Sequence, residues 1–135
     1  MTDTRQPQRI DSHHHLWRYT PEEYGWIGDD MASLRRDFLL DDLRQEMATA
    51  RVDGAVAVQA RQTLEETRWL LELAQDDRSP VWGVVGWMPI ASANFPQLLE
   101  KFIPNQILRG LRHIVQAEQP GFLDNKQFNA GIVQL

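Results

Sequence analysis

The sequence has 135 residues, the size of one domain, and we expect residues 1–135 to form a single domain. Its hydrophobic fraction of 42% and aromatic fraction of 9% are ordinary for a chain that buries a core, unlike a disordered polar chain. The formal net charge is -5 and no block of Lys and Arg stands out, which excludes the basic footprint of a nucleic-acid binder. The absence of cysteine excludes a disulfide scaffold, a cysteine zinc site and a cysteine nucleophile.

The N-terminal segment and the apolar runs indicate where the protein resides. The segment "MTDTRQPQ" is polar and lacks the apolar core of a signal peptide. The longest apolar runs fall well short of the about 20 residues that a membrane helix needs. We therefore expect a soluble, cytoplasmic protein with no membrane or nucleic-acid partner.

The first predicted strand, residues 9–15 ("RIDSHHH"), carries three consecutive histidines. Alternate side chains of a strand share a face, so Asp11, His13 and His15 are expected to point one way and His14 the other. Two imidazoles two residues apart can converge on one cation, which is the geometry of a His-x-His half-site. His13 and His15 are therefore candidate catalytic residues and candidate metal ligands. The alternative is a structural pair with no ligand.

The connection that follows, residues 16–38, is long and rich in aromatic residues. Connections of that length without an obvious element of their own are often functional. A poorly ordered insertion is the alternative, but Tyr24 and Trp26 count against it because large aromatic side chains usually pack on something. We therefore favour an ordered connection over a disordered insertion.

Helical and strand patterns then alternate along the chain. Apolar spacing and capping signals predict helices within 40–54, 63–77, 92–105 and 124–135, and apolar runs predict strands at 54–60, 81–90 and 108–116. Such alternation is typical of parallel βαβ units. Four units fit either an open doubly wound sheet or half of an eight-stranded barrel. No glycine-rich phosphate loop follows the first strand, so the dinucleotide fingerprint is missing.

Several polar and aromatic side chains stand near the predicted strand ends. Parallel α/β folds bind ligands at the carboxyl ends of their strands. Candidate substrate-binding residues at these ends are Gln59, Trp87, Arg112 and His113. Arg61 is a further residue that could line the site. The alternative assigns them to the rim or to packing, with Arg112 paired to an acidic group of the helical layer and His113 a satisfied polar residue.

Seven blocks of the sequence, in this order, resemble the amidohydrolase superfamily: "IDSHHHLW", "EYGWI", "LRRDFLLDDL", "DGAVAVQA", "ETRWLLELA", "GVVGWMPI" and "LRGLRHIVQ". The branch that they resemble most is the sugar-lactone and pyrone-dicarboxylate lactonase group, with L-fuconolactonase-like and L-rhamnonolactonase-like members. The resemblance runs from Ile10 to about Leu135. It implies an α/β fold of the (β/α)8 TIM-barrel type, with about the first four βα units present here.

The resemblance also implies an activity, the hydrolysis of a sugar-acid lactone or a related small cyclic ester. It makes His13 and His15 the strand-one pair that polarises the carbonyl, directly or through one divalent metal, zinc foremost. Metal-free operation is an alternative, because some members of the branch work without a metal. Arg112 and His113 would hold the lactone, helped by Trp26, Gln59 and Trp87. A carboxylate general base must activate the water.

Members of this branch are about twice as long as the present sequence. Their later-strand histidines and their strand-eight aspartate, which acts as the base, have no counterpart here. We therefore expect the N-terminal half of a longer enzyme, a half-barrel that pairs with a second copy, or a relative without catalysis. Two further functions stay open: a non-catalytic half-barrel that binds a metal, a small anion or a partner chain, and a decarboxylase of the same superfamily.

Overall fold

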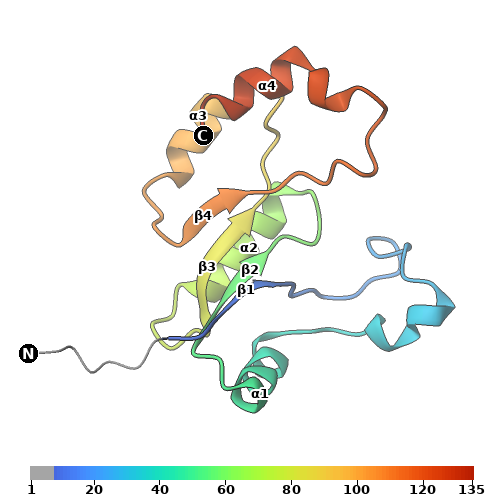
Figure 1. The fold of residues 1–135 in the computed structure, drawn as a ribbon, viewed down its shortest axis with the longest axis vertical. Coiled ribbons are helices and arrows are strands. Elements are labelled where there is room, and N and C mark those ends of the chain that lie inside the picture. The colour runs from blue at the N-terminus through green and yellow to red at the C-terminus, as the bar shows by residue number, and fades with distance from the viewer. Residues whose placement is uncertain (1–7) are drawn as a thin grey trace, which may run out of the picture.

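The computed structural model describes residues 8–135, and the polar segment 1–7 lies outside the described residues. Strands and helices alternate along the chain (Figure 1). Their bounds are β1 (Ile10–His14), η1 (Asp29–Leu34), α1 (Leu40–Ala50), β2 (Gly54–Val58), α2 (Leu64–Ala74), β3 (Val81–Gly86), α3 (Phe95–Phe102), β4 (Leu108–Leu111), η2 (Phe122–Asp124) and α4 (Lys126–Ile132). The strands form one parallel sheet in the order β1-β2-β3-β4, which confirms the predicted βα pattern.

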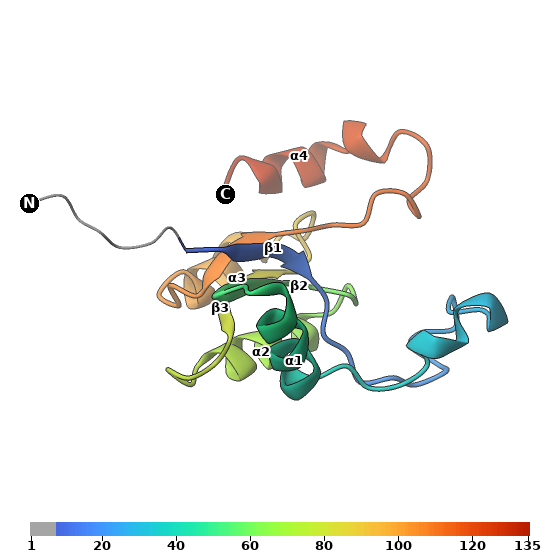
Figure 2. The ribbon, with the colours of Figure 1, turned by 60° about the horizontal axis from the view of Figure 1, so that its bottom comes forward.

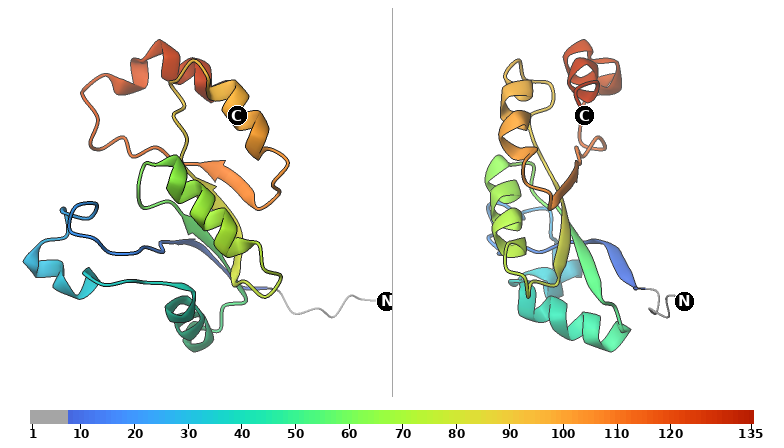
Figure 3. Two further views of the ribbon diagram at one scale, coloured as in Figure 1. Left: turned by 180° about the vertical axis from the view of Figure 1, so that it is seen from behind. Right: turned by 90° about the vertical axis from the view of Figure 1, so that its left-hand side faces the viewer.

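Helices α1 and α2 cover one face of this sheet (Figures 2 and 3). The Thr63 hydroxyl accepts a hydrogen bond from the backbone N–H of Glu66 and caps α2, as the capping signal predicted. Within residues 8–135, none of the helices is long and apolar enough to cross a membrane. Buried apolar side chains fill the space between the helices and the sheet, among them Leu16, Leu43, Met47, Ala55, Ala57, Leu70, Val81 and Val84.

Strand β1 contains a shift in its pairing register with β2 that the sequence does not predict. Asp11 lies opposite Ala55, whereas His14 lies opposite Ala57, so three steps along β1 match two along β2. This extra residue resets the alternation of side chains. Asp11 and His14 consequently lie opposite Ala55 and Ala57, which both belong to the core under the helices. Both also line a cavity of about 200 Å³ against α1, to which His15 contributes as well. The prediction that Asp11 and His14 point to opposite faces of the strand is therefore wrong.

Strands β3 and β4 are shorter than predicted, because side chains replace the backbone ladder at their carboxyl ends. The hydroxyl of Thr67 accepts from the backbone N–H of Trp87 (2.8 Å) and donates to its carbonyl oxygen (2.7 Å). The side-chain amide of Gln59 donates to the carbonyl oxygen of Arg112 (3.0 Å). The residues after β3 and β4 are thereby held by α2 and by the segment after β2.

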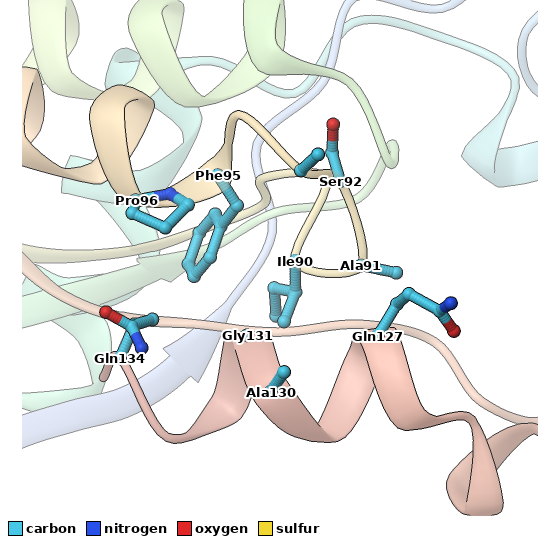
Figure 4. A pocket seen from close by; sticks show the side chains of 10 residues that line it. Ile90, Ala91, Ser92, Phe95, Pro96, Gln127, Ala130, Gly131 and Gln134 are labelled. Carbon is cyan, nitrogen blue, oxygen red and sulfur yellow. The ribbon is translucent and has the colours of Figure 1, made fainter.

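The C-terminal helix α4 packs against the segment that precedes α3 (Figure 4). A methyl group on Gly131 would lie 2.0 Å from the carbonyl oxygen of Ile90, so this contact requires glycine. Phe128 of α4 joins a second apolar cluster with Met88 and Phe95. The cavity of about 240 Å³ beside this contact contains none of the predicted site residues; it is lined by Ile90, Ala91, Ser92, Ala93, Phe95, Pro96, Gln127, Ala130, Gly131 and Gln134.

Candidate functional site

A cavity of about 600 Å³ opens at the carboxyl ends of the strands, within the usual volume range of small-molecule sites. It lies between the long 16–38 connection, the end of β1 and the segment that follows β4. Its walls are mainly apolar and aromatic, and its basic lining residues are His15 and Arg112. The full lining is His15, Trp17, Tyr24, Trp26, Leu34, Ala60, Arg112, Ile114 and Ala117.

The histidine pair stands at one side of this cavity with its ring nitrogens turned toward each other. The Nε2 atoms of His13 and His15 are 3.3 Å apart. The Nδ1 atom of His15 lies 2.9 Å from the carbonyl oxygen of Val58, to which it donates, so its Nε2 carries a lone pair. Two nitrogens bound at roughly 2.05 Å to a tetrahedral ion lie about 3.3 Å apart. The pair therefore has the spacing of two ligands of one metal ion.

The surroundings of His15 favour the neutral, ligating form of its ring. Burial lowers the pKa of His15 below its ordinary value, and the positive charge of Arg112 lowers it further. The hydrogen bond to Val58 raises this pKa but does not outweigh the other two effects. A neutral imidazole is the form that binds a metal. Within the described part of the chain, no group of three or more His, Cys, Asp or Glu side chains could hold an ion. The pair thus offers two positions of a coordination shell.

Arg112 faces His15 across the cavity and is fixed by Gln59. Its Nη2 donates to the backbone oxygen of Gln59 (2.6 Å) and to the side-chain oxygen of the same residue (3.1 Å). Gln59 is fully buried. Burial lowers the pKa of Arg112, which the negative charge of Glu66 partly opposes. A partly desolvated guanidinium interacts more strongly with a bound anion than one in water does.

Trp87 and His113 lie together in an adjacent aromatic cluster. The indole N–H of Trp87 donates to Nδ1 of His113 (3.2 Å), and Nε2 of His113 lies 2.7 Å from a carboxylate oxygen of Glu118. The His113 ring stacks on Phe122, with 4.9 Å between the ring centroids. The structure therefore brings His15, Trp26 and Arg112 to one cavity. His13 lies against His15 and Gln59 holds Arg112, although neither lines the cavity itself. Trp87 and His113 bond to each other beside it.

A buried ionic network beside the cavity escaped the sequence analysis. Glu66 is fully buried, and its carboxylate accepts from the backbone N–H of Ala60 (2.6 Å) and from Nε of Arg61 (2.6 Å). Nη1 of Arg61 also bonds Glu23 of the long connection. In the sequence, Glu66 stands three residues after Thr63, which is the spacing of a capping box and predicts the bond from its backbone N–H to the Thr63 hydroxyl. That pattern predicts neither Ala60 nor Arg61 as a partner of the Glu66 carboxylate.

Residues 10–131 match the family model described as Amidohydrolase. The chain belongs to the amidohydrolase family. It is 41% identical over 131 residues to an L-fucono-1,5-lactonase of Burkholderia multivorans (strain ATCC 17616 / 249), covering 94% of this chain and 43% of that protein. It is 33% identical over 108 residues to an L-fucono-1,5-lactonase of Burkholderia ambifaria (strain ATCC BAA-244 / DSM 16087 / CCUG 44356 / LMG 19182 / AMMD), covering 80% and 37%.

A solved amidohydrolase from Burkholderia multivorans with bound zinc superposes with a TM-score of 0.84 and 39% identity. The match covers 93% of this chain and 44% of that one, so the chain spans less than half the length of its relatives. The fold is accordingly α/β, with four consecutive βα units of the amidohydrolase TIM barrel. This confirms the half-barrel prediction over the open doubly wound sheet.

Proposed function

We propose that this chain forms part of a hydrolase that opens a sugar-acid lactone by addition of water. The observation that carries the proposal is the histidine pair: two Nε2 atoms 3.3 Å apart, beside a cavity whose wall also carries the Arg112 guanidinium. The names of the two Burkholderia relatives support a lactone as the substrate class. The zinc in the related structure supports a divalent metal at the pair.

In this proposal the chain's own residues bind and polarise the ester. A divalent metal, when bound by His13 and His15, supplies Lewis-acid polarisation of the carbonyl. Arg112 stabilises the negative charge that develops on the carbonyl oxygen or holds a carboxylate of the product, and Gln59 fixes its direction. Without a metal, an N–H donor of His13 and the N–H donors of Arg112 would share the polarisation of the carbonyl, because the N–H of His15 is taken by Val58.

The aromatic residues supply the remaining substrate contacts of the proposal. Trp26 stands 66% exposed at the cavity mouth, where its ring can lie against the apolar face of a sugar. Trp87 and His113 bound the site from the neighbouring cluster, where their mutual hydrogen bond fixes both rings. These roles follow from position, and substitution of each residue tests them.

The proposal also requires a carboxylate base from another part of the barrel. Both oxygens of Glu66 are occupied, by Ala60 and by Arg61. Asp11 accepts from the backbone N–H of His13 and lies opposite the buried Ala55, on the helical side of the sheet. Neither carboxylate is therefore directed at the histidine pair. We place the base in the portion of the relatives that this chain does not match.

The decisive experiment is acid release from L-fucono-1,5-lactone and other sugar lactones. The chain is assayed alone and co-expressed with the unmatched portion of the Burkholderia multivorans relative, with and without added zinc. We expect hydrolysis above the spontaneous rate from the assembled protein, and a loss of at least about 100-fold in His15→Ala, since one ligand and its lone pair are removed.

The matched control is His14→Gln, because His14 lies in the same tripeptide but opposite the buried Ala57, on the helical side of the sheet. It should retain most of the wild-type rate. An assembled, folded protein that releases no acid, or a His15→Ala variant as active as wild type, would refute the proposed function. Release of carbon dioxide from an acid in place of lactone opening would favour the decarboxylase.

A further inference from the structure

We propose that Arg61 is a positioning residue that ties the aromatic wall of the cavity to the sheet. Its guanidinium joins the buried Glu66 to Glu23, and Glu23 directly precedes the wall residue Tyr24. The consequence for substrate binding rests on the proposed function, whereas the structural link can be tested without any substrate.

One arm of Arg61 is anchored to the scaffold. Its Nε donates to Oε2 of Glu66 (2.6 Å), and Oε1 of the same carboxylate accepts from the backbone N–H of Ala60 (2.6 Å). Glu66 belongs to the first turn of α2 and is fully buried, so its orientation is fixed. A buried carboxylate needs such partners, because water does not reach it. Arg61 is therefore held to both β2 and α2.

The other arm reaches the long connection. Nη1 of Arg61 forms a salt bridge with Glu23. Glu23 belongs to a tight turn, in which its backbone N–H donates to the Thr20 hydroxyl (3.3 Å) and the N–H of Tyr24 donates to the Thr20 carbonyl oxygen (3.0 Å). The N–H of Ile27 then donates to the Tyr24 carbonyl oxygen (2.9 Å). The position of Glu23 therefore also determines the positions of Tyr24 and of the residues after it.

This turn carries the wall of the cavity. Tyr24 is only 2% exposed and lines the cavity, and Trp26 lies at its mouth. The other salt bridges of the connection do not reach the strand ends: Arg35 pairs with Asp29 inside it, and Arg36 pairs with Asp42 at the start of α1. The bond between Arg61 and Glu23 is thus the ionic link between the wall and β2 among residues 8–135.

Hydrogen exchange measured by mass spectrometry on the 135-residue chain tests the link directly. Glu23→Gln removes the charge of the outer arm and leaves the pair of Arg61 and Glu66 intact, so the fold is retained. We expect exchange of the Tyr24 and Ile27 amides to accelerate about threefold to tenfold, the effect of losing one partly exposed ion pair. Arg61→Lys, which keeps the charge but loses the fork, should fall between wild type and Glu23→Gln.

The matched control is Asp29→Asn, which removes the other salt bridge inside the same connection. It should leave exchange at Tyr24 unchanged. Unaltered exchange at Tyr24 in Glu23→Gln, or an equal acceleration in Asp29→Asn, would overturn the positioning role whatever the enzymatic result.

The lactone assay separates this proposal from the proposed function. In the assembled protein, Glu23→Gln should raise KM about threefold to tenfold with kcat little changed, because the wall contacts the substrate and not the reacting bond. Faster exchange combined with an unchanged KM would overturn the link between the wall and binding. Faster exchange in Glu23→Gln, together with an assembled wild-type protein that opens no lactone, supports the tether and refutes the hydrolase.

Discussion

Glu66 shows how much one side chain organises at the carboxyl end of the sheet. Its backbone N–H caps α2 with Thr63, and its carboxylate holds Ala60 and Arg61. The Arg61 guanidinium would have a lower pKa from burial alone, but the bonds and charges of Glu66 and Glu23 outweigh burial and raise it. The charge of Arg61 is therefore permanent, and the buried carboxylate depends on it.

Removal of Arg61 should accordingly cost more than removal of an ordinary surface arginine. Arg61→Met keeps the apolar stem but leaves the Glu66 carboxylate buried without its cation, which we expect to lower the free energy of unfolding by about 3 kcal/mol. Urea unfolding followed by circular dichroism measures the change. The double variant Arg61→Met with Glu66→Gln should recover part of the loss. A loss below about 0.5 kcal/mol, the usual size for surface substitutions, would contradict the prediction.

At the scale of the element, the sequence predicted the βα order and the convergence of His13 and His15 because both follow from local periodicity. The extra residue of β1 was not predictable, since no glycine or proline marks it and it depends on pairing with β2. The early ends of β3 and β4 depend on Thr67 and Gln59, which lie far away along the chain.

The separation of Trp87 and His113 from the rest of the predicted site also depends on contacts between distant segments of the chain. His113 was expected beside Arg112, its neighbour in sequence. The structure bonds His113 to Trp87, 26 residues earlier, and to Glu118 in the segment after β4. Such partners depend on how strand ends and loops meet, and spacing along one strand carries no information about them.

Helix α1 offers a pH test at this scale. The Asp42 carboxylate accepts from the backbone N–H of Leu39 (3.0 Å) and from Arg36 (2.9 Å), and these bonds hold its pKa below the ordinary value. A carboxyl group whose pKa is lowered by folding stabilises the folded state above its unfolded pKa of about 3.9. That contribution disappears as the pH falls through the lower, folded value.

We therefore expect Asp42→Ala to lower the urea midpoint at pH 6, with the difference from wild type shrinking progressively below about pH 4. Midpoints followed by circular dichroism from pH 6 to about pH 2.5 give the comparison. Asp41→Ala serves as the control, because Asp41 lies in the same turn but bonds only the exposed Arg44. A difference between Asp42→Ala and wild type that stays constant with pH would contradict this account.

At the scale of the whole molecule, the inner face of the sheet, the one that would line a closed barrel, stays exposed at β1 and β3. Figure 2 shows α4 on this side of the sheet. The helices α1 and α2 lie on the other face, and β1 and β4 are edge strands of the described sheet. Trp82 of β3 is 41% exposed and lies against Gly54, where an added methyl group would meet its ring at 2.1 Å. Ile10 of β1 is 52% exposed. In a closed barrel such side chains would be covered by the opposite strands.

The exposed side chains of this face predict how it meets the portion of the barrel that this chain does not match. Co-expression with the unmatched portion of the Burkholderia multivorans relative should give a complex in which acrylamide quenches Trp82 less than in the chain alone, because the ring becomes buried. Trp82→Ser should weaken the complex by about tenfold or more, as expected for a buried aromatic anchor. Trp26→Ser, which alters an even more exposed tryptophan of the 16–38 connection, should leave assembly unchanged. If both variants assemble like wild type, the inner face is not the surface that closes the barrel, and the catalytic base must reach the histidine pair from another side.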